Sequence, residues 1–311
     1  MNTKKVYLKA LAYELGELHS IDEVSELKED PQVLNTLLTL GLDKYSKSSL
    51  TLSGIAKISA LKTMEKAPII DQDIDVLLYA TNSFRNFKST GLAEICHLID
   101  ELSLERAYPI GINLSECGNL QAAIRVGTSL IKSEDCNNVL IVTTDKGAVG
   151  GSRIISPNIS VTSDAAASFI LTNSETDAEF EMVCNKQHMN PGVSYIDPMR
   201  DGLQYLEAIM EGIKKTSHMT LIEIGKEPKD FRKLIINNYN TSVTKTICDI
   251  LEFDHEQVYS KNIPRFAHAW ASDNIINLYD FLLETPLLPN DLIMLIGTGT
   301  SAWGCTVLSK I

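Results

Sequence analysis

Apolar residues recur along the chain at two spacings, and together they predict an α/β protein. Apolar runs typical of strands occupy 6–12, 74–81, 108–113, 139–144, 164–172, 180–186, 234–237, 292–297 and 305–308. Residues spaced three and four apart, typical of helices, occupy 34–42, 52–66, 92–102, 118–132, 199–215, 242–251 and 272–283. Alternation of the two kinds of segment favours a layered sheet covered by helices.

The remaining segments predict connections. A polar, acidic stretch leads from the first strand to Asp30, and 147–163 is a loop rich in Gly, Ser and Pro. A second turn rich in Gly, Thr and Ser lies at 297–304. The second half of the chain repeats the style of the first, and no linker is long enough to separate independent domains. We therefore expect two α/β halves, 1–173 and 174–311, that share one sheet system.

Cys117 is predicted between the end of a strand and the start of a helix. Unpaired backbone N–H groups and the positive end of the helix dipole meet there. Such a position favours the thiolate and lowers the pKa of a cysteine below its free value of about 8.5. The competing interpretation is a small buried hydrophobic residue, which is the role of most free cysteines.

Composition excludes several classes of function. The net charge of −12 argues against a nucleic-acid or anionic-membrane surface. Six scattered cysteines form no CxxC pair, and the histidines have no metal-ligand spacing, so we expect no metal. Lys9 and Glu14 interrupt the apolar N-terminus, which is unlike a signal peptide. No apolar run approaches the roughly 20 residues that span a bilayer. We expect a cytoplasmic protein with thiols in a reducing compartment.

Four segments carry a family resemblance. They are SECGNLQAAIRVGTSLIKSEDCNNVLIVTTDK (115–146), SDAAASFILTN (163–173), RFAHAWASDNIINLYDFL (265–282) and GTGTSAWGCTVL (297–308). In this order they resemble the nucleophile, Gly-Asp-Gly-Ala, catalytic-Asn and Trp-Gly segments of the β-ketoacyl-ACP synthase III group of the thiolase superfamily. The resemblance implies a thiolase-like fold, with two pseudo-repeated βαβαβ halves layered α-β-α-β-α. It also implies a homodimer with the nucleophile segment near the two-fold axis.

Two positions depart from the condensing enzymes of this family. In those enzymes a His and an Asn stabilise the enolate that forms when malonyl-ACP loses CO2. Here Asn237, in IINNYN, stands at the place of the His, and His268 stands at the place of the Asn. The usual pair of donors for decarboxylative condensation is therefore absent.

The spacing of His268 and Asp273 resembles instead the Cys-His-Asp acyltransferases of natural-product pathways. By that resemblance Cys117 is the nucleophile, His268 the general base and Asp273 the residue that orients the imidazole. Cys117 and the 299–301 stretch, which includes Thr300, would supply oxyanion donors. Asn237 would donate a hydrogen bond to the acyl group or the acceptor.

Structural interpretations compete with each assignment. His268 lies between aromatic residues and can be a core histidine, Asp273 can be a first-turn residue favoured by the helix dipole, and Asn237 can be a turn or packing residue. Asp164 is expected to set a turn or a dimer contact. The other cysteines are expected to be structural, namely Cys96, Cys136, Cys184, Cys248 and Cys305.

Three functional hypotheses follow. The first is an acyltransferase of secondary metabolism that moves an acyl group from an acyl-carrier protein or acyl-CoA to a hydroxyl or amine, without a bound cofactor. The second is a decarboxylating condensing enzyme, and the third is a non-catalytic partner subunit. An acidic chain would bind an acidic carrier through a local basic patch. The candidates for such a patch are Lys214, Lys215, Lys229, Arg232 and Lys233, which can equally form solvated faces.

Overall fold

The computed structural model describes residues 4–67, 73–86, 91–147, 151–155 and 159–311. The first half contains the strands β1 (Tyr7–Leu15), β2 (Glu17–Ser20), β3 (Lys44–Lys47), β4 (Val76–Ala80), β5 (Tyr108–Ile112), β6 (Asn138–Asp145), β7 (Ile154–Ile155), β8 (Ser160–Val161) and β9 (Ala165–Thr172). Its helices are α1 (Ser25–Glu29), α2 (Pro31–Thr39), α3 (Leu52–Lys66), α4 (Gly91–Glu101) and α5 (Asn119–Lys132).

The second half contains the strands β10 (Phe180–Met189), β11 (Phe231–Ile235), β12 (Leu292–Thr298) and β13 (Ala302–Lys310). Its helices are α7 (Gly202–Ile224), α8 (Thr241–Ile250), α9 (Ile263–Phe266) and α10 (Asp273–Glu284). The predicted division of the chain at 173/174 falls in the connection between β9 and β10.

One sheet contains nine of these strands, in the order β11-β12-β13-β10-β1-β9-β6-β4-β5. On one side of the sheet, β1 pairs with β9 and β9 with β6 in antiparallel fashion, and β6 pairs with β4 and β4 with β5 in parallel fashion. On the other side, β10 pairs with β13 and β13 with β12 in antiparallel fashion, and β12 pairs with β11 in parallel fashion. At the place that corresponds to β5, Val258 makes a single parallel bridge to Leu234. The same arrangement of strands therefore occurs twice, joined by the antiparallel pairing of β1 with β10.

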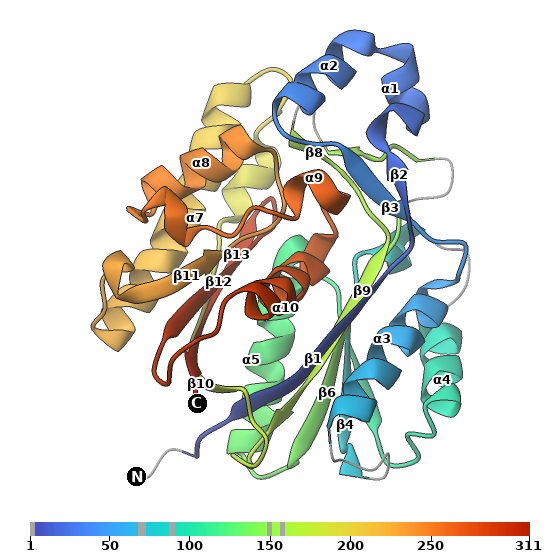
Figure 1. Cartoon of the computed structure of the whole chain (residues 1–311), viewed down its shortest axis with the longest axis vertical. Coiled ribbons are helices and arrows are strands. Elements are labelled where there is room, and N and C mark those ends of the chain that lie inside the picture. Colours follow the sequence, from blue (N-terminus) through green and yellow to red (C-terminus); the bar gives the residue numbers. More distant parts are fainter. Residues whose placement is uncertain (1–3, 68–72, 87–90, 148–150, 156–158) are drawn as a thin grey trace.

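Helices form three layers around the two parts of the sheet (Figure 1). The helix α3 packs on β1, β6 and β9, and α4 packs on α3, while α7 packs on β10, β12 and β13. The helices α5 and α10 contact strands of both halves and lie between them. The predicted α-β-α-β-α layering is therefore present, and the central layer carries the starts of α5 and α10.

A close approach seats α5 against the second half. Gly297 and Gly304 face each other across β12 and β13. A Cβ at Gly304 would lie 2.4 Å from Cβ of Gln121, and one at Gly297 would lie 2.0 Å from its Oε1. Gln121 Nε2 donates to Asn274 Oδ1 at 2.6 Å, which ties α5 to α10. This hydrogen bond between α5 and α10, together with the close approach of Gln121 to Gly297 and Gly304, fixes the position of α5 relative to α10 and to the second half.

Several sequence predictions of local structure were incomplete. The predicted acidic connection contains β2 and α1, and β3 pairs with β2. The loop 147–163 contains the short pair β7–β8, and residues 148–150 and 156–158 of that loop lie outside the described residues. These elements are two to five residues long, too short to show a periodicity. The helix α7 extends to Ile224, nine residues beyond its predicted end at 215, and β13 begins inside the predicted turn.

No helix in the described ranges is both long enough and apolar enough to cross a membrane.

Candidate active site

Cys117 lies at the entry to α5, in a single 3-10 turn formed by Glu116–Gly118. The turn begins with Glu116 at a φ of 51°, a conformation that costs energy for a residue with a side chain. Ser115 anchors it: its carbonyl accepts the Gly118 N–H at 2.8 Å and its N–H donates to Asn119 Oδ1 at 2.8 Å. The buried thiol is thereby held at a fixed place, with Sγ 3.1 Å from Nε2 of His268.

His268 comes from the connection between α9 and α10, 151 residues away from Cys117 in sequence. Its N–H donates to the Val161 carbonyl at 3.0 Å, and its carbonyl accepts the Ser163 N–H at 2.8 Å. Ala267 and Trp270 on either side have φ of 56°. Backbone strain on both sides of a fully buried histidine is typical of a residue held for function rather than packing alone.

Asp273, the first residue of α10, orients the imidazole. Its Oδ2 lies 2.5 Å from His268 Nδ1 and accepts the Asn238 N–H at 2.9 Å. Its Oδ1 accepts the Ala269 N–H at 2.7 Å and Asn238 Nδ2 at 3.2 Å. These donors stabilise a carboxylate that is fully buried. Because Nδ1 donates to the carboxylate, Nε2 of the neutral ring is the acceptor that faces the thiol.

The predicted lowering of the Cys117 pKa is wrong for this structure. Burial raises the pKa of the thiol well above its usual value, and the negative charges of Glu116, Asp273 and Asp145 raise it further. Desolvation of the charged form therefore outweighs the dipole of α5. A thiol in this environment needs a base in contact to lose its proton, and Nε2 of His268 lies in contact with Sγ.

Asn237 is 1% exposed and is not among the side chains that line the site's cavity. Its Nδ2 donates to the Trp270 carbonyl at 2.8 Å, and its Oδ1 accepts the Thr298 N–H at 2.9 Å. The amide therefore links the loop that carries His268 to the end of β12. Its predicted hydrogen bond to a bound substrate has no support in this geometry.

Thr300 does lie in the cavity wall, in the turn between β12 and β13. Its N–H donates to the Glu116 carboxylate at 2.6 Å, and the Gly299 N–H donates to the Ala302 carbonyl at 2.8 Å. Two of the donors that were predicted in the 299–301 stretch are thus occupied within the protein. They do not form an oxyanion hole in this conformation.

An apolar cavity of about 370 Å³ ends at Cys117 and His268. Its apolar walls come from β7 and the following loop, from one face of α7, and from α8. Those residues are Ile154, Ile155, Ile159, Tyr205, Leu206, Ile209, Met210, Ile213, Val243 and Ile247. Positions 205, 206, 209, 210 and 213 follow the three-and-four spacing of one helix face. A thioester with an apolar chain or arm fits the chemistry of these walls.

Sequence reasoning missed four residues in the cavity wall: Glu116, Thr162, Tyr239 and Trp270. The Tyr239 ring stacks on His268 with centroids 5.2 Å apart. Trp270 Nε1 and the Thr162 hydroxyl are buried and have no hydrogen-bond partner among the described residues. Three of the four are sequence neighbours of predicted residues: Glu116 precedes Cys117, Tyr239 follows Asn237 by two positions, and Trp270 follows His268 by two positions.

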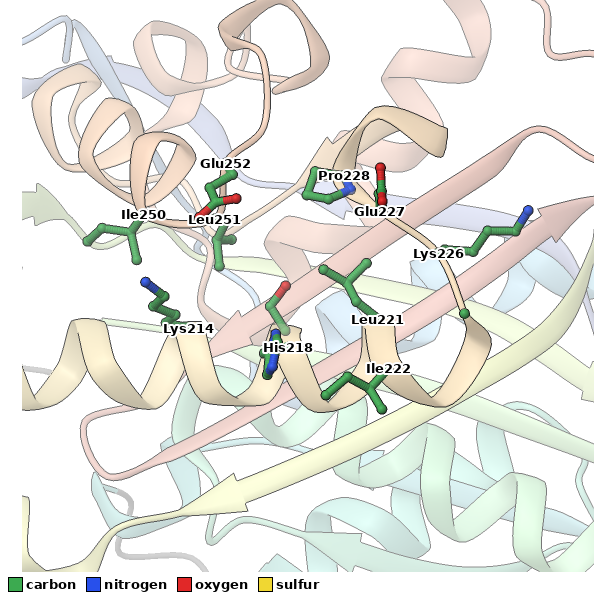
Figure 2. A pocket seen from close by; sticks show the side chains of 12 residues that line it. Lys214, His218, Leu221, Ile222, Lys226, Glu227, Pro228, Ile250, Leu251 and Glu252 are labelled. Carbon is green, nitrogen blue, oxygen red and sulfur yellow. The ribbon is translucent and has the colours of Figure 1, made fainter.

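The other residues singled out by the sequence lie away from this cavity. Asp164 forms an ion pair with Arg153 at 2.9 Å and accepts the Ser48 N–H, so it ties Arg153 to the residue that follows β3. A second cavity, of about 430 Å³, lies where the later part of α7 faces the end of α8 (Figure 2). Lys214 lies in the wall of this cavity together with Glu227 and Glu252, so the wall carries charges of both signs.

Of the other candidates for a basic patch, Lys229 and Lys233 have partners within the protein. Lys229 pairs with Glu227 at 2.6 Å, and Lys233 Nζ donates to the Glu256 carbonyl at 2.8 Å. Within the described ranges, no three His, Cys, Asp or Glu residues are grouped as a metal site would require.

The chain is similar to known proteins of one enzyme family. Residues 221–310 match the family model "3-Oxoacyl-[acyl-carrier-protein (ACP)] synthase III C terminal". A β-ketoacyl-[acyl-carrier-protein] synthase III of Clostridium perfringens is 22% identical over 285 residues, which cover 85% of this chain and 86% of the relative.

Two solved structures show the fold at full length. The acyltransferase ChlB3 superposes with a TM-score of 0.86 at 16% identity, covering 99% of this chain and 98% of that one. The priming β-ketosynthase from the R1128 polyketide biosynthetic pathway superposes with a TM-score of 0.83 at 14% identity, covering 99% and 97%.

The doubled strand pattern and the Cys117 site at the start of a central helix define a thiolase-fold protein. Within that fold, residues 221–310 are similar to the C-terminal part of the 3-oxoacyl-[acyl-carrier-protein] synthase III family, and 85% of the chain aligns with the curated synthase at 22% identity.

Proposed function

We propose that this protein is an acyltransferase that carries an acyl group on Cys117 between a thioester donor and a hydroxyl or amine acceptor. The observation that supports this most directly is the chain of contacts from Cys117 Sγ to His268 Nε2 at 3.1 Å and from His268 Nδ1 to Asp273 Oδ2 at 2.5 Å. This is the arrangement by which a base activates a nucleophile and a carboxylate orients the base.

The first half-reaction transfers the acyl group to the enzyme. His268 Nε2 takes the thiol proton as Sγ attacks the carbonyl carbon of the donor, and Asp273 stabilises the imidazolium that results. When the tetrahedral intermediate collapses, the bond from carbon to the donor's sulfur breaks. The imidazolium then gives its proton to the departing thiolate, which leaves Cys117 acylated and His268 neutral.

The second half-reaction reverses the roles. The acceptor's O–H or N–H gives its proton to His268 Nε2 while its oxygen or nitrogen attacks the acyl carbon. The bond to Cys117 Sγ breaks, and the proton returns to the thiolate. Trp270 Nε1 and the Thr162 hydroxyl line the cavity and have no hydrogen-bond partner among the described residues, so both are side-chain donors available to the substrate's oxygens.

Two features favour this reaction over decarboxylative condensation. Asn237 is engaged by Trp270 and Thr298, so it is not free to stabilise an enolate. His268, in contact with Asp273, is set up to accept a proton at Nε2, whereas an enolate requires a donor there. The structural likeness to ChlB3, which is described as an acyltransferase, agrees with the proposal. We extend it to a cytoplasmic enzyme of secondary metabolism that uses acyl-carrier protein or acyl-CoA.

We also propose that the protein forms a homodimer through β5. This strand is last in the order of the large sheet, and β4 is its strand partner. An unpaired strand edge is a template for pairing with another chain. Tyr108 on β5 and Leu114 just after it are 72% and 80% exposed, which adds apolar area to that edge. The edge lies directly before the turn that carries Cys117.

The proposal is tested by intact-mass measurement after incubation with acyl-CoAs and acyl-carrier proteins, malonyl donors included. We expect a covalent adduct on the wild type that is absent in Cys117→Ala and forms at least about a hundredfold more slowly in His268→Ala. Addition of a true acceptor then discharges the adduct.

The competing functions give different results in the same experiment. A malonyl adduct that loses CO2 and yields a 3-oxo product identifies a condensing enzyme. Absence of any adduct, together with co-purification of a second chain, identifies a non-catalytic partner subunit.

A further inference from the structure

Glu116 is a carboxylate in the wall of the cavity that ends at Cys117. Among the described residues that line this cavity it is the single Asp or Glu, and no Lys or Arg accompanies it. The other polar groups are hydroxyls, an indole, the thiol and the imidazole of His268. A substrate that enters therefore meets one carboxylate with no lysine or arginine in the described wall to offset its charge.

The carboxylate is held in place beside the nucleophile. Its Oε2 accepts the Thr300 N–H at 2.6 Å, which connects it to the turn between β12 and β13. The backbone of Glu116, at a positive φ, belongs to the same turn that presents Cys117, so the carboxylate is one residue away from the thiol. Its charge acts on the site, because it contributes to raising the pKa of the Cys117 thiol and of the Tyr239 hydroxyl.

We propose that Glu116 is a specificity-determining residue that excludes carboxylated acyl groups, so that the donor carries an uncharged acyl group. This inference rests on the proposed function of Cys117 as the acyl carrier. A malonyl group bound as a thioester at Cys117 would bring a second carboxylate into a cavity with apolar walls. Two like charges a few ångströms apart repel each other, and the repulsion is stronger near a protein surface than in bulk water. An uncharged acyl group of the same size pays no such cost.

The test compares two donors of equal shape. Isovaleryl and malonyl groups have the same number and arrangement of heavy atoms, but malonyl ends in a carboxylate and isovaleryl in two methyl groups. The measured quantity is the rate of adduct formation at Cys117, followed by intact mass. Each acyl group is offered on pantetheine, on CoA and on carrier protein. An acetyl adduct formed from a malonyl donor is counted as malonyl, because it is a malonyl adduct that has lost CO2. We expect the wild type to favour isovaleryl.

The informative variant is Glu116→Gln. The glutamine oxygen still accepts the Thr300 N–H, whereas the charge is lost. We expect the malonyl-to-isovaleryl rate ratio to rise about tenfold in this variant. A change in the reactivity of the Cys117 thiol would alter both rates alike and cancel in the ratio. Glu116→Ala removes both the charge and the hydrogen bond. If the malonyl-to-isovaleryl rate ratio is the same in Glu116→Ala as in Glu116→Gln, the loss of charge explains the change. Glu227→Gln, in the wall of the second cavity (Figure 2), is the matched control and leaves the ratio unchanged.

Each other outcome has a definite meaning. A wild-type adduct with isovaleryl and an unchanged ratio in Glu116→Gln would overturn the inference and leave the acyltransferase proposal standing. Loss of the isovaleryl adduct in Glu116→Gln would assign Glu116 to acylation itself and overturn its role in selectivity. No wild-type adduct with isovaleryl on any carrier would overturn the proposed function, and the inference with it.

Discussion

The two halves of this protein each bury a carboxylate near the central layer, and the two carboxylates differ in what they contact. Asp145 ends β6 of the first half, and Asp273 begins α10 of the second half; both are fully buried. Asp273 has donors on both oxygens and touches His268. Asp145 receives its donors on Oδ1, and its Oδ2 has no partner among the described residues.

The missing donor on Oδ2 coincides with a large shift in the pKa of Asp145. Burial raises the pKa of Asp145 to about 7, although hydrogen bonds from Thr81, Asn82 and Ser83 oppose the shift. Burial therefore gives, in the first half, a carboxyl group that gains a proton near neutral pH, whereas the Asp273 side chain of the second half has hydrogen-bond donors on both oxygens. The two side chains lie at different places in their halves, one at the end of a strand and one at the start of a helix, and only Asp273 contacts the imidazole of His268.

The sharpest way to break this comparison is to remove the charge from each carboxylate in turn. Asp273→Asn should slow adduct formation at Cys117 by roughly 10²- to 10⁴-fold, because an amide N–H facing His268 Nδ1 forces the other tautomer and leaves Nε2 unable to accept the thiol proton. The matched variant Asp145→Asn should stay within about tenfold of the wild type. Intact-mass kinetics with one donor measures both. Equal losses in the two variants would show that the carboxylates act alike.

A second test concerns the support that the second half gives to the nucleophile helix. Gly304→Ala should lower the free energy of unfolding by roughly 2 kcal/mol, because its Cβ would lie 2.4 Å from Gln121 Cβ and α5 would have to shift. Gly111→Ala, where a Cβ meets nothing within 4 Å, is the control. Urea denaturation measures both variants. If Gly304→Ala proves as mild as Gly111→Ala, the packing of α5 on β12 and β13 is not what fixes its position.

The smallest expected effect is a pH dependence of stability. Because the folded-state pKa of Asp145 lies above its unfolded value, the folded state binds the proton more tightly. This group's contribution to stability is therefore fully present below about pH 4 and is lost as the pH rises through about 7. Asp145→Asn removes this loss, so its stability relative to the wild type should rise by about 2 kcal/mol between pH 5 and pH 8.

Urea midpoints at the two pH values measure this difference. The exposed Asp22 provides the control, since Asp22→Asn should show no such pH dependence. A constant offset between Asp145→Asn and the wild type at both pH values would contradict a shifted titration of Asp145.

The apolar patterns predicted the large elements because these elements are long and one-sided. The helix α3 occupies the predicted range 52–66, and β4 is buried throughout, as its continuous apolar run indicated. The family resemblance supplied the fold, which the comparisons support. It also named Cys117, His268 and Asp273, which the structure brings into contact; their catalytic roles stay predictions.

Other features were beyond the reach of local patterns. The pKa of Cys117 depends on how much water the packed structure removes and on charges from Asp145 and Asp273, which are distant in sequence. The role of Asn237 depends on partners at 270 and 298 that a spacing along the chain does not reveal. Glu116 was passed over because its importance comes from the cavity and from its bond to Thr300, 184 residues away.

The sequence by itself determined the order of the long strands and helices, since hydrophobic periodicity is a local property of the chain. Its motif order also determined which residues were candidates for chemistry. Only the tertiary structure decided which side chains meet in the cavity, because the two halves each contribute one side of the site. It likewise decided the protonation of each buried group, because solvent exclusion and hydrogen-bond donors arise only when distant segments pack together.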